Sequence, residues 1–174
     1  MSAILAPSDP KQTPPSLMDI SEPSARNVSE SAVDEAISNL GFRELVEKLD
    51  TAASRTIIEK TAEVLIEDRK KIWWWDSIRP DVLSAHKQIA DGYSRLADVC
   101  PEETCYLVVT DDLEDSYWAV YSLETRLLKQ LIGDCHAFEY LVVSPDFDWV
   151  VFENHHDMLI GAGQAVADRI KSLS

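Results

Sequence analysis

The sequence predicts an α+β protein with a helical N-terminal half followed by an antiparallel sheet of two hairpins, in the order β-β-α-β-β-α. Two changes of pattern predict this class. Between residues 29 and 96, apolar residues recur at steps of three and four, the period of an amphipathic helix. After Pro101, short β-branched and aromatic runs alternate with polar turns. We expect the helices to lie on one face of the sheet.

The first 28 residues are expected to be a disordered leader. They contain five of the eight prolines, with serines between them and only isolated apolar residues. Such a segment cannot bury enough surface to offset the entropy cost of ordering. Residues 29–174 are expected to form a single acidic domain, which is a normal length for one core.

Helices are predicted at three places in the N-terminal half. Gly41 suits the end of the first helix, a short apolar stripe follows it up to Leu49, and Pro80 with Asp81 favours the start of the third helix. The apolar positions that define the three helices are Val33, Ala36, Ile37 and Leu40; Ile57, Ile58, Ala62 and Leu65; and Val82, His86, Ile89, Tyr93 and Leu96.

Two hairpins are predicted in the C-terminal half. The first pairs residues 105–110 with residues 117–122 across an acidic turn, and the second pairs residues 138–143 with residues 149–153. Pro145 suits the second position of the second turn.

Two further helices complete the predicted order. One covers residues 123–132, between the hairpins. The other begins near Asp157 and carries a C-terminal apolar stripe at Leu159, Ala162, Val166, Ile170 and Leu173.

The net charge is −15, and its distribution is uneven. Residues 98–174 contain 15 acidic and 4 basic side chains, which is −11 of that total. Such a field repels nucleic acid and anionic membranes and attracts cationic proteins. An acidic surface that serves solubility alone is the alternative interpretation.

The chain is expected to stay in the cytoplasm. Its three cysteines, Cys100, Cys105 and Cys135, are an odd number without repeated spacing, which is typical of reduced thiols. The sequence has no apolar run of about 18 residues or more and no secretory signal pattern at its start.

The segment IWWWD at residues 72–76 has three adjacent indoles. On a strand Trp73 and Trp75 would share one face while Trp74 takes the other. We therefore expect Trp73 and Trp75 in the core and consider Trp74 as an interface residue, since exposed tryptophan is common in binding hot spots.

The segment ENHHD at residues 153–157 combines two imidazoles with two carboxylates, which are metal-ligand and acid/base groups. Adjacent histidines on an extended segment point in opposite directions, so the spacing of His155 and His156 does not fit a simple metal site. His136 could supply a distant third ligand, but nothing in the sequence requires it. The alternatives are that Asn154 and Asp157 cap the last helix, or that the segment is an interface.

The remaining candidate binding residues lie in the two hairpin turns and beside them. The first turn contains clustered carboxylates without the alternating ligands and glycine of a calcium loop. We interpret both turns as acidic projections toward a basic partner. The full set of candidate partner-binding residues is Trp74, Asp111, Asp112, Glu114, Asp115, Tyr117, Asp146, Asp148, Glu153, His155, His156 and Asp157.

No catalytic or cofactor motif is present: the sequence lacks a GxSxG elbow, a GxxxxGK[ST] loop and a GxGxxG fingerprint. We therefore expect no enzyme, no cofactor and no metal. An enzyme would have to use His155, His156, Glu153 and Cys135 alone.

The helical first half, the IWWWD segment, the two hairpins and the ENHHDMLIG stretch at residues 153–161 together resemble a known kind of domain. Over residues 54–174 the chain is similar to small acidic bacterial immunity proteins of polymorphic or contact-dependent toxin systems. The resemblance implies a protein-binding module that covers the active site of a cognate, basic toxin. The chain is expected to be a monomer or homodimer. The alternatives are an acidic chaperone of a secreted effector and a metal-dependent hydrolase that uses His155 and His156.

Overall fold

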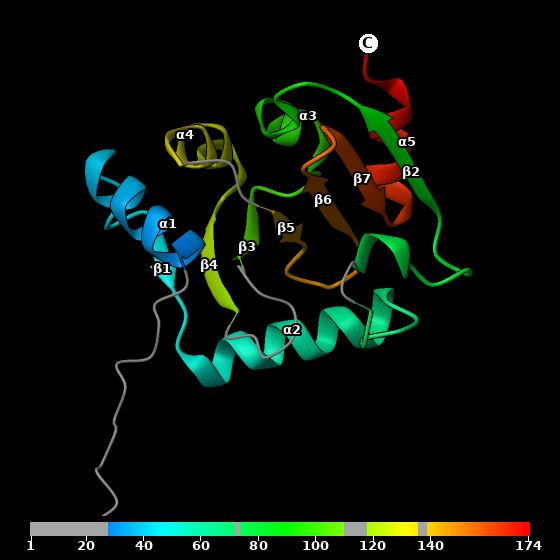
Figure 1. The fold of residues 1–174 in the computed structure, drawn as a ribbon, viewed down its shortest axis with the longest axis horizontal. Coiled ribbons are helices and arrows are strands. Elements are labelled where there is room, and N and C mark those ends of the chain that lie inside the picture. Colours follow the sequence, from blue (N-terminus) through cyan, green and yellow to red (C-terminus); the bar gives the residue numbers. More distant parts are fainter. Residues whose placement is uncertain (1–27, 72–73, 110–117, 136–138) are drawn as a thin grey trace, which may run out of the picture.

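The structure is a computed structural model that describes residues 28–71, 74–109, 118–135 and 139–174. A seven-stranded antiparallel sheet in the order β1-β4-β3-β5-β6-β7-β2 forms its centre, and helices cover both faces of the sheet (Figure 1). The strands are β1 Val46–Lys48, β2 Ser84–Gln88, β3 Thr104–Val109, β4 Ala119–Glu124, β5 Tyr140–Val143, β6 Val150–Asn154 and β7 Met158–Ala162.

Among the described residues the structure has five α-helices and three short 3-10 helices. None of these helices is long and apolar enough to cross a membrane. The α-helices are α1 Val28–Asn39, α2 Thr51–Leu65, α3 Leu96–Val99, α4 Leu128–Asp134 and α5 Gln164–Ser172, and the 3-10 helices are η1 Trp74–Asp76, η2 Gly92–Arg95 and η3 Thr125–Leu127.

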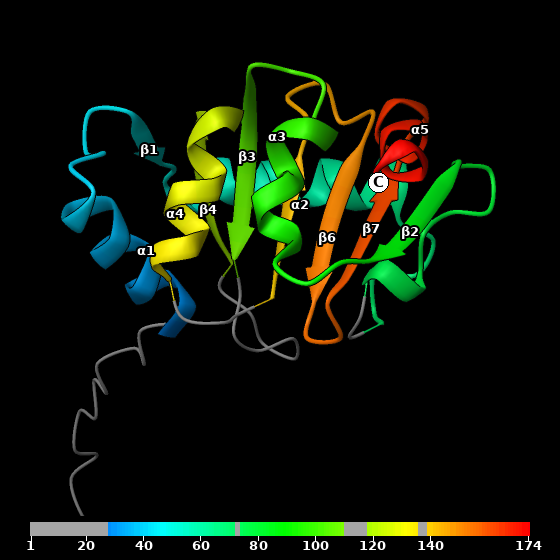
Figure 2. The ribbon, with the colours of Figure 1, turned by 90° about the horizontal axis from the view of Figure 1, so that it is seen from above.

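The sheet has an apolar layer on each face. On one face α1, α3, α4 and α5 pack over side chains such as Leu107 and Val151, which are fully buried. On the other face α2 packs over Val108, Val120 and Val143 (Figures 1 and 2). The central strands β3, β5 and β6 are therefore buried on both sides, which is why they are nearly continuous apolar runs.

The predicted mixture of helices with an antiparallel sheet is confirmed, and the strands of both predicted hairpins pair as expected. The sheet is larger than the predicted two hairpins, because β1, β2 and β7 also belong to it. β3 pairs with β4 and β5 pairs with β6, each antiparallel. The first two predicted helices are α1 and α2, and the helix between the hairpins is formed by η3 and α4. The Asp50 carboxylate begins α2 by accepting a hydrogen bond from the Ala53 N–H at 2.8 Å.

Three predictions of the arrangement are wrong. The helices were predicted to lie on one face of the sheet, but they cover both faces, because α2 lies on the face opposite the other α-helices. The third helix of the N-terminal half is replaced by the edge strand β2, with η2 and α3 after it. The final helix begins at Gln164, because residues from Met158 onward first form β7.

Gly163 allows the chain to turn from β7 into α5. Its φ of +112° belongs to the region that favours glycine, and a Cβ at this position would lie 2.4 Å from the carbonyl oxygen of Asp148. This close approach packs the start of α5 against the β5–β6 turn.

Candidate functional site

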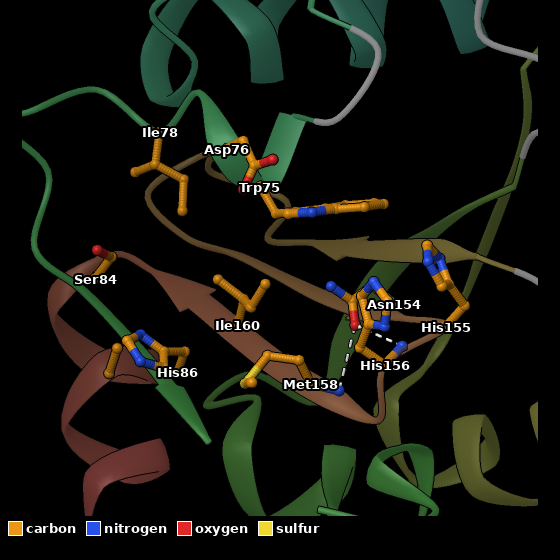
Figure 3. A pocket seen from close by; sticks show the side chains of 11 residues that line it. Trp75, Asp76, Ile78, Ser84, His86, Asn154, His155, His156, Met158 and Ile160 are labelled. Atoms are coloured by element: carbon orange, nitrogen blue, oxygen red, sulfur yellow. Dashed lines mark hydrogen bonds between the residues drawn. The ribbon is translucent and has the colours of Figure 1, made fainter. Parts of the chain in front are cut away.

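An open cleft of about 700 Å³ lies on the α2 side of the sheet, next to the β2 edge (Figure 3). Its floor is formed by β7 and β2, its upper wall by η1 and the residues that follow it, and its far end by the turn between β6 and β7. The lining residues are Trp75, Asp76, Ile78, Ser84, Ala85, His86, Asn154, His155, His156, Met158 and Ile160.

The β6–β7 turn holds the two adjacent histidines at the end of the cleft. The Asn154 side-chain oxygen accepts hydrogen bonds from the backbone N–H groups of His156 at 3.0 Å and Met158 at 3.3 Å, as Figure 3 shows. Asp157 has a φ of +55°, a left-handed conformation that aspartate tolerates in turns. Asn154 and Asp157 therefore shape a hairpin turn, and the alternative that they cap the last helix is wrong.

Three imidazoles line the cleft, and they come from two elements. His155 Nδ1 lies 2.5 Å from Oε1 of Glu139, and the His155 ring centroid lies 3.9 Å from that of His156. The prediction that these two side chains point in opposite directions is therefore wrong, because they lie in a turn and not on an extended strand. His86 lies on β2 opposite Ile160 of β7. Sequence reasoning missed His86 as a site residue because it placed this residue on a helix. Two-residue alternation across Ser84, His86 and Gln88 was the available signal.

The tryptophans have roles opposite to those predicted. Trp74 is 7% exposed and packs against Trp118, with ring centroids 4.6 Å apart. Trp75 is partly exposed, lines the cleft and meets Phe152 edge-on at 6.3 Å. The expectation of a surface-exposed Trp74 is therefore wrong, and Trp75 is the indole that reaches the cleft. Trp73 lies outside the described residues.

Glu153 lies on the opposite face of the sheet from the cleft and is half-buried. Its carboxylate accepts hydrogen bonds from the Tyr140 hydroxyl and from the backbone N–H groups of Gly92 and Tyr93. Burial raises the pKa of Glu153, although these hydrogen bonds lower it. A Cβ on Gly92 would lie 2.7 Å from Oε1 of Glu153, so a larger residue here would displace the carboxylate from its present position. Glu153 therefore does not join the histidines in the cleft.

The predicted acidic residues in the turns that the structure describes lie at two opposite rims of the sheet. Residues 155–157 lie at one end, here called the histidine rim, where Tyr140 pairs with Glu153. β3 ends at Val109 and β4 begins at Ala119, and both residues lie at this same rim, next to Tyr140. The predicted site residues between them, Asp111, Asp112, Glu114, Asp115 and Tyr117, lie outside the described residues.

Asp146 and Asp148 are exposed at the other end of the sheet, in the β5–β6 turn. Here Val143 pairs with Val150 and with Tyr106, close to where β3 begins. Asp146 and Asp148 therefore do not share a rim with residues 155–157, because the strand register places them at the opposite end of the sheet.

Within the described residues no group of three or more His, Cys, Asp or Glu side chains is arranged to hold a metal ion. Cys100 and Cys105 are buried and reduced, and burial raises the pKa of Cys105 to about 12 and that of Cys135 to about 11. Such thiols are poor nucleophiles at neutral pH. The cleft offers aromatic, imidazole and carboxylate groups for recognition.

The fold and the cleft define a mixed α/β protein with a central antiparallel sheet and one open, imidazole-lined cleft among the described residues. The model of a protein family described as "Family of unknown function (DUF6756)" matches residues 24–174, and the chain belongs to this family. No curated protein and no solved structure matches the chain.

Proposed function

We propose that this chain is a non-catalytic, protein-binding module of the immunity type, which neutralises a cognate bacterial toxin in the cytoplasm by covering its basic active site. The observation that carries the proposal is the excess of 15 acidic over 4 basic side chains in residues 98–174. A cationic surface is attracted by such a field, whereas nucleic acid and anionic membranes are repelled.

The placement of these acids supports the proposal. Asp146 and Asp148 at one rim, and Asp157 at the other, are exposed and form no salt bridge with any described residue. The bases in this region are partly occupied: Arg126 pairs with Glu124 at 2.5 Å. Unpaired carboxylates at a rim act mainly on the rate of association and on partner choice.

The cleft contains an aromatic side chain that could contribute much of the binding free energy, which exposed carboxylates at a rim do not supply. Interfaces of ordinary size, about 1,600 Å² in total, gain most of their binding free energy from a few aromatic or arginine side chains in desolvated pockets. Trp75 is partly exposed above Met158 and Ile160, so it presents an aromatic surface beside an apolar floor. We expect this cleft to lie inside the interface.

The two alternatives have less support in the described residues. An effector chaperone uses a continuous apolar groove, but the exposed large apolar residues Leu45, Val64 and Leu83 come from three separate segments of the chain. A metal-dependent hydrolase needs a ligand set, and in the described part of the chain no group of three or more His, Cys, Asp or Glu side chains is arranged to hold a metal ion.

Isolation of the full chain with its partner tests the proposal. A tagged chain purified from its native cells is expected to carry one stoichiometric protein of high isoelectric point. Equimolar addition of the pure chain should abolish that protein's toxicity or enzymatic activity, because the active site is covered. A stoichiometric partner that keeps full activity when bound, or an acidic partner, would contradict the proposal.

A further inference from the structure

The outer edge of β2 carries unused backbone hydrogen-bonding groups. β2 is the last strand in the sheet order. Gly163 N–H donates to Leu83 O, and Ile89 N–H donates to Asp157 O, each at 2.8 Å. Because backbone groups alternate in direction along a strand, the odd-numbered residues between these points bond to β7. The N–H and C=O groups of Ser84, His86 and Gln88 therefore point away from the sheet, and no described residue bonds to them.

The residues with outward backbone groups also face the cleft. Ser84 and His86 line it, and His86 pairs with Ile160, whose side chain forms part of its floor. Side chains on neighbouring strands lie on the same face at paired positions. A strand added beside β2 would therefore extend the floor of the cleft and project every second side chain over it.

The residues of the cleft and the net charge of the chain favour an arginine side chain on a strand added beside β2. Asp76 is an exposed carboxylate next to Trp75, and both line the upper wall. A guanidinium group stacks on an aromatic ring and donates paired hydrogen bonds to a carboxylate, which a neutral or acidic side chain cannot do. The net charge of −15 adds a long-range attraction for a cationic segment.

We propose that the β2 edge binds an extended, arginine-bearing segment of the partner protein as an added strand, with one arginine in the cleft beside Trp75 and Asp76. The proposal rests on the proposed function, since it names the part of the partner that is recognised. Strand addition supplies affinity through the main chain, and the cleft supplies selectivity through the side chain.

Titration of the full chain with a blocked five-residue peptide of alternating valine and arginine, followed by amide NMR, tests this site. We expect shifts at the amides of Ser84, His86 and Gln88 and at the Trp75 indole. A peptide of alternating valine and glutamate should bind at least about tenfold more weakly, because a carboxylate would face Asp76. Shifts confined to the rim of Asp146 and Asp148, or equal binding of both peptides, would overturn the proposal.

Two variants separate backbone from side-chain recognition. Gln88→Pro removes an outward N–H without removing a bond to β7, so the arginine peptide should bind about fivefold more weakly than to the control Gln88→Ala, the effect of about one hydrogen bond. Asp76→Asn should weaken binding of the arginine peptide by a similar factor and leave the glutamate peptide unaffected or tighter. Unchanged affinity in folded Gln88→Pro contradicts strand addition; unchanged affinity in Asp76→Asn contradicts the arginine site.

The outcomes distinguish this site from the proposed function. If a basic partner is neutralised while Gln88→Pro and Asp76→Asn leave its affinity unchanged, the β2 site is wrong and the function stands. If the peptide binds at β2 but the partner from native cells is acidic or stays active, the function is wrong and the site stands.

Discussion

Glu153 is a carboxyl group that the fold keeps partly away from water. Burial raises its pKa above the ordinary value of 4.5. The native state therefore binds more protons than the unfolded state between pH 4.5 and the raised pKa, and the free energy of unfolding falls as pH rises through that window. In Glu153→Gln this contribution is absent. Chemical denaturation across the window should show that the stability of the natural chain, relative to the variant, decreases with rising pH.

An exposed glutamate provides the control for this prediction. Glu63 lies on the solvent side of α2, and Glu63→Gln should leave the pH dependence of unfolding close to that of the natural chain. A relative stability of the natural chain over Glu153→Gln that rises with pH would mean that hydrogen bonds to the carboxylate outweigh its burial.

The tryptophans show where residue-scale reasoning from sequence reaches its limit. Alternation on a strand predicts that Trp74 and Trp75 point in opposite directions, and they do differ in burial. The predicted assignment is reversed because these residues form a 3-10 helix, in which α2 and Trp118 cover Trp74. The local sequence indicates that the two indoles differ in burial. It does not show that Trp118, which is distant in the sequence, packs against Trp74.

At the scale of elements, α1 is held to the sheet by a partly buried polar contact. The Tyr121 ring on β4 is fully buried, and its hydroxyl donates to Oδ1 of Asp34 at 3.0 Å. Lys48 on β1 bonds the same carboxylate at 2.5 Å and Glu30 at 2.7 Å. This cluster joins one helix to two strands at the sheet edge.

Tyr121→Phe should lower the free energy of unfolding by about 1 kcal/mol, because Asp34 loses a hydrogen bond while the apolar packing is kept. The change is measured as a shift in the denaturant midpoint. Tyr106→Phe is the matched control, since the Tyr106 hydroxyl makes no hydrogen bond with the described residues and its ring stacks on Phe147. Equal midpoints for the two variants would show that the Tyr121 contact contributes nothing.

The hairpins β3–β4 and β5–β6 could be predicted from sequence because their strands are β-branched or aromatic and are separated by turn residues. β2 could not, since the sequence SAHKQ has weak strand propensity and its flanking apolar residues fall at helical spacing. β7 was missed for a related reason: Leu159 and Ala162 continue the apolar spacing of α5. Both strands are stabilised by pairing with each other, a long-range contact that local pattern does not contain.

Only part of the candidate site could be predicted, because most of it depends on the pairing of β2 with β7. The ENHHD segment was found because its residue types are unusual together, and it does form one end of the cleft. Ser84, His86 and Met158 lie on β2 and β7, the two strands that sequence reasoning placed in helices. The cleft as a whole exists only once these strands pair.

At the scale of the whole molecule, helices cover both faces of the sheet (Figure 2). Under the proposed function we expect a partner to contact the rims, the β2 edge and the cleft. The exposed acids Asp146 and Asp148 lie at one rim, and the cleft lies toward the histidine rim. A basic partner that contacts either region is attracted by the field of the whole chain, which carries a net charge of −15. We therefore expect electrostatic attraction to set how fast a basic partner associates with the chain.

The most direct test is the association rate of the reconstituted complex between about 50 and 500 mM salt, where the Debye length falls from roughly 14 to 4 Å. We expect the rate to fall steeply with salt, and Asp146→Lys with Asp148→Lys to reduce both the rate and its salt dependence if this rim contacts the partner. Glu59→Lys with Glu63→Lys on the solvent side of α2 changes the net charge equally and controls for a general field effect. A rate that is independent of salt and unchanged in both double variants would contradict electrostatic recognition and leave the acidic surface a role in solubility alone.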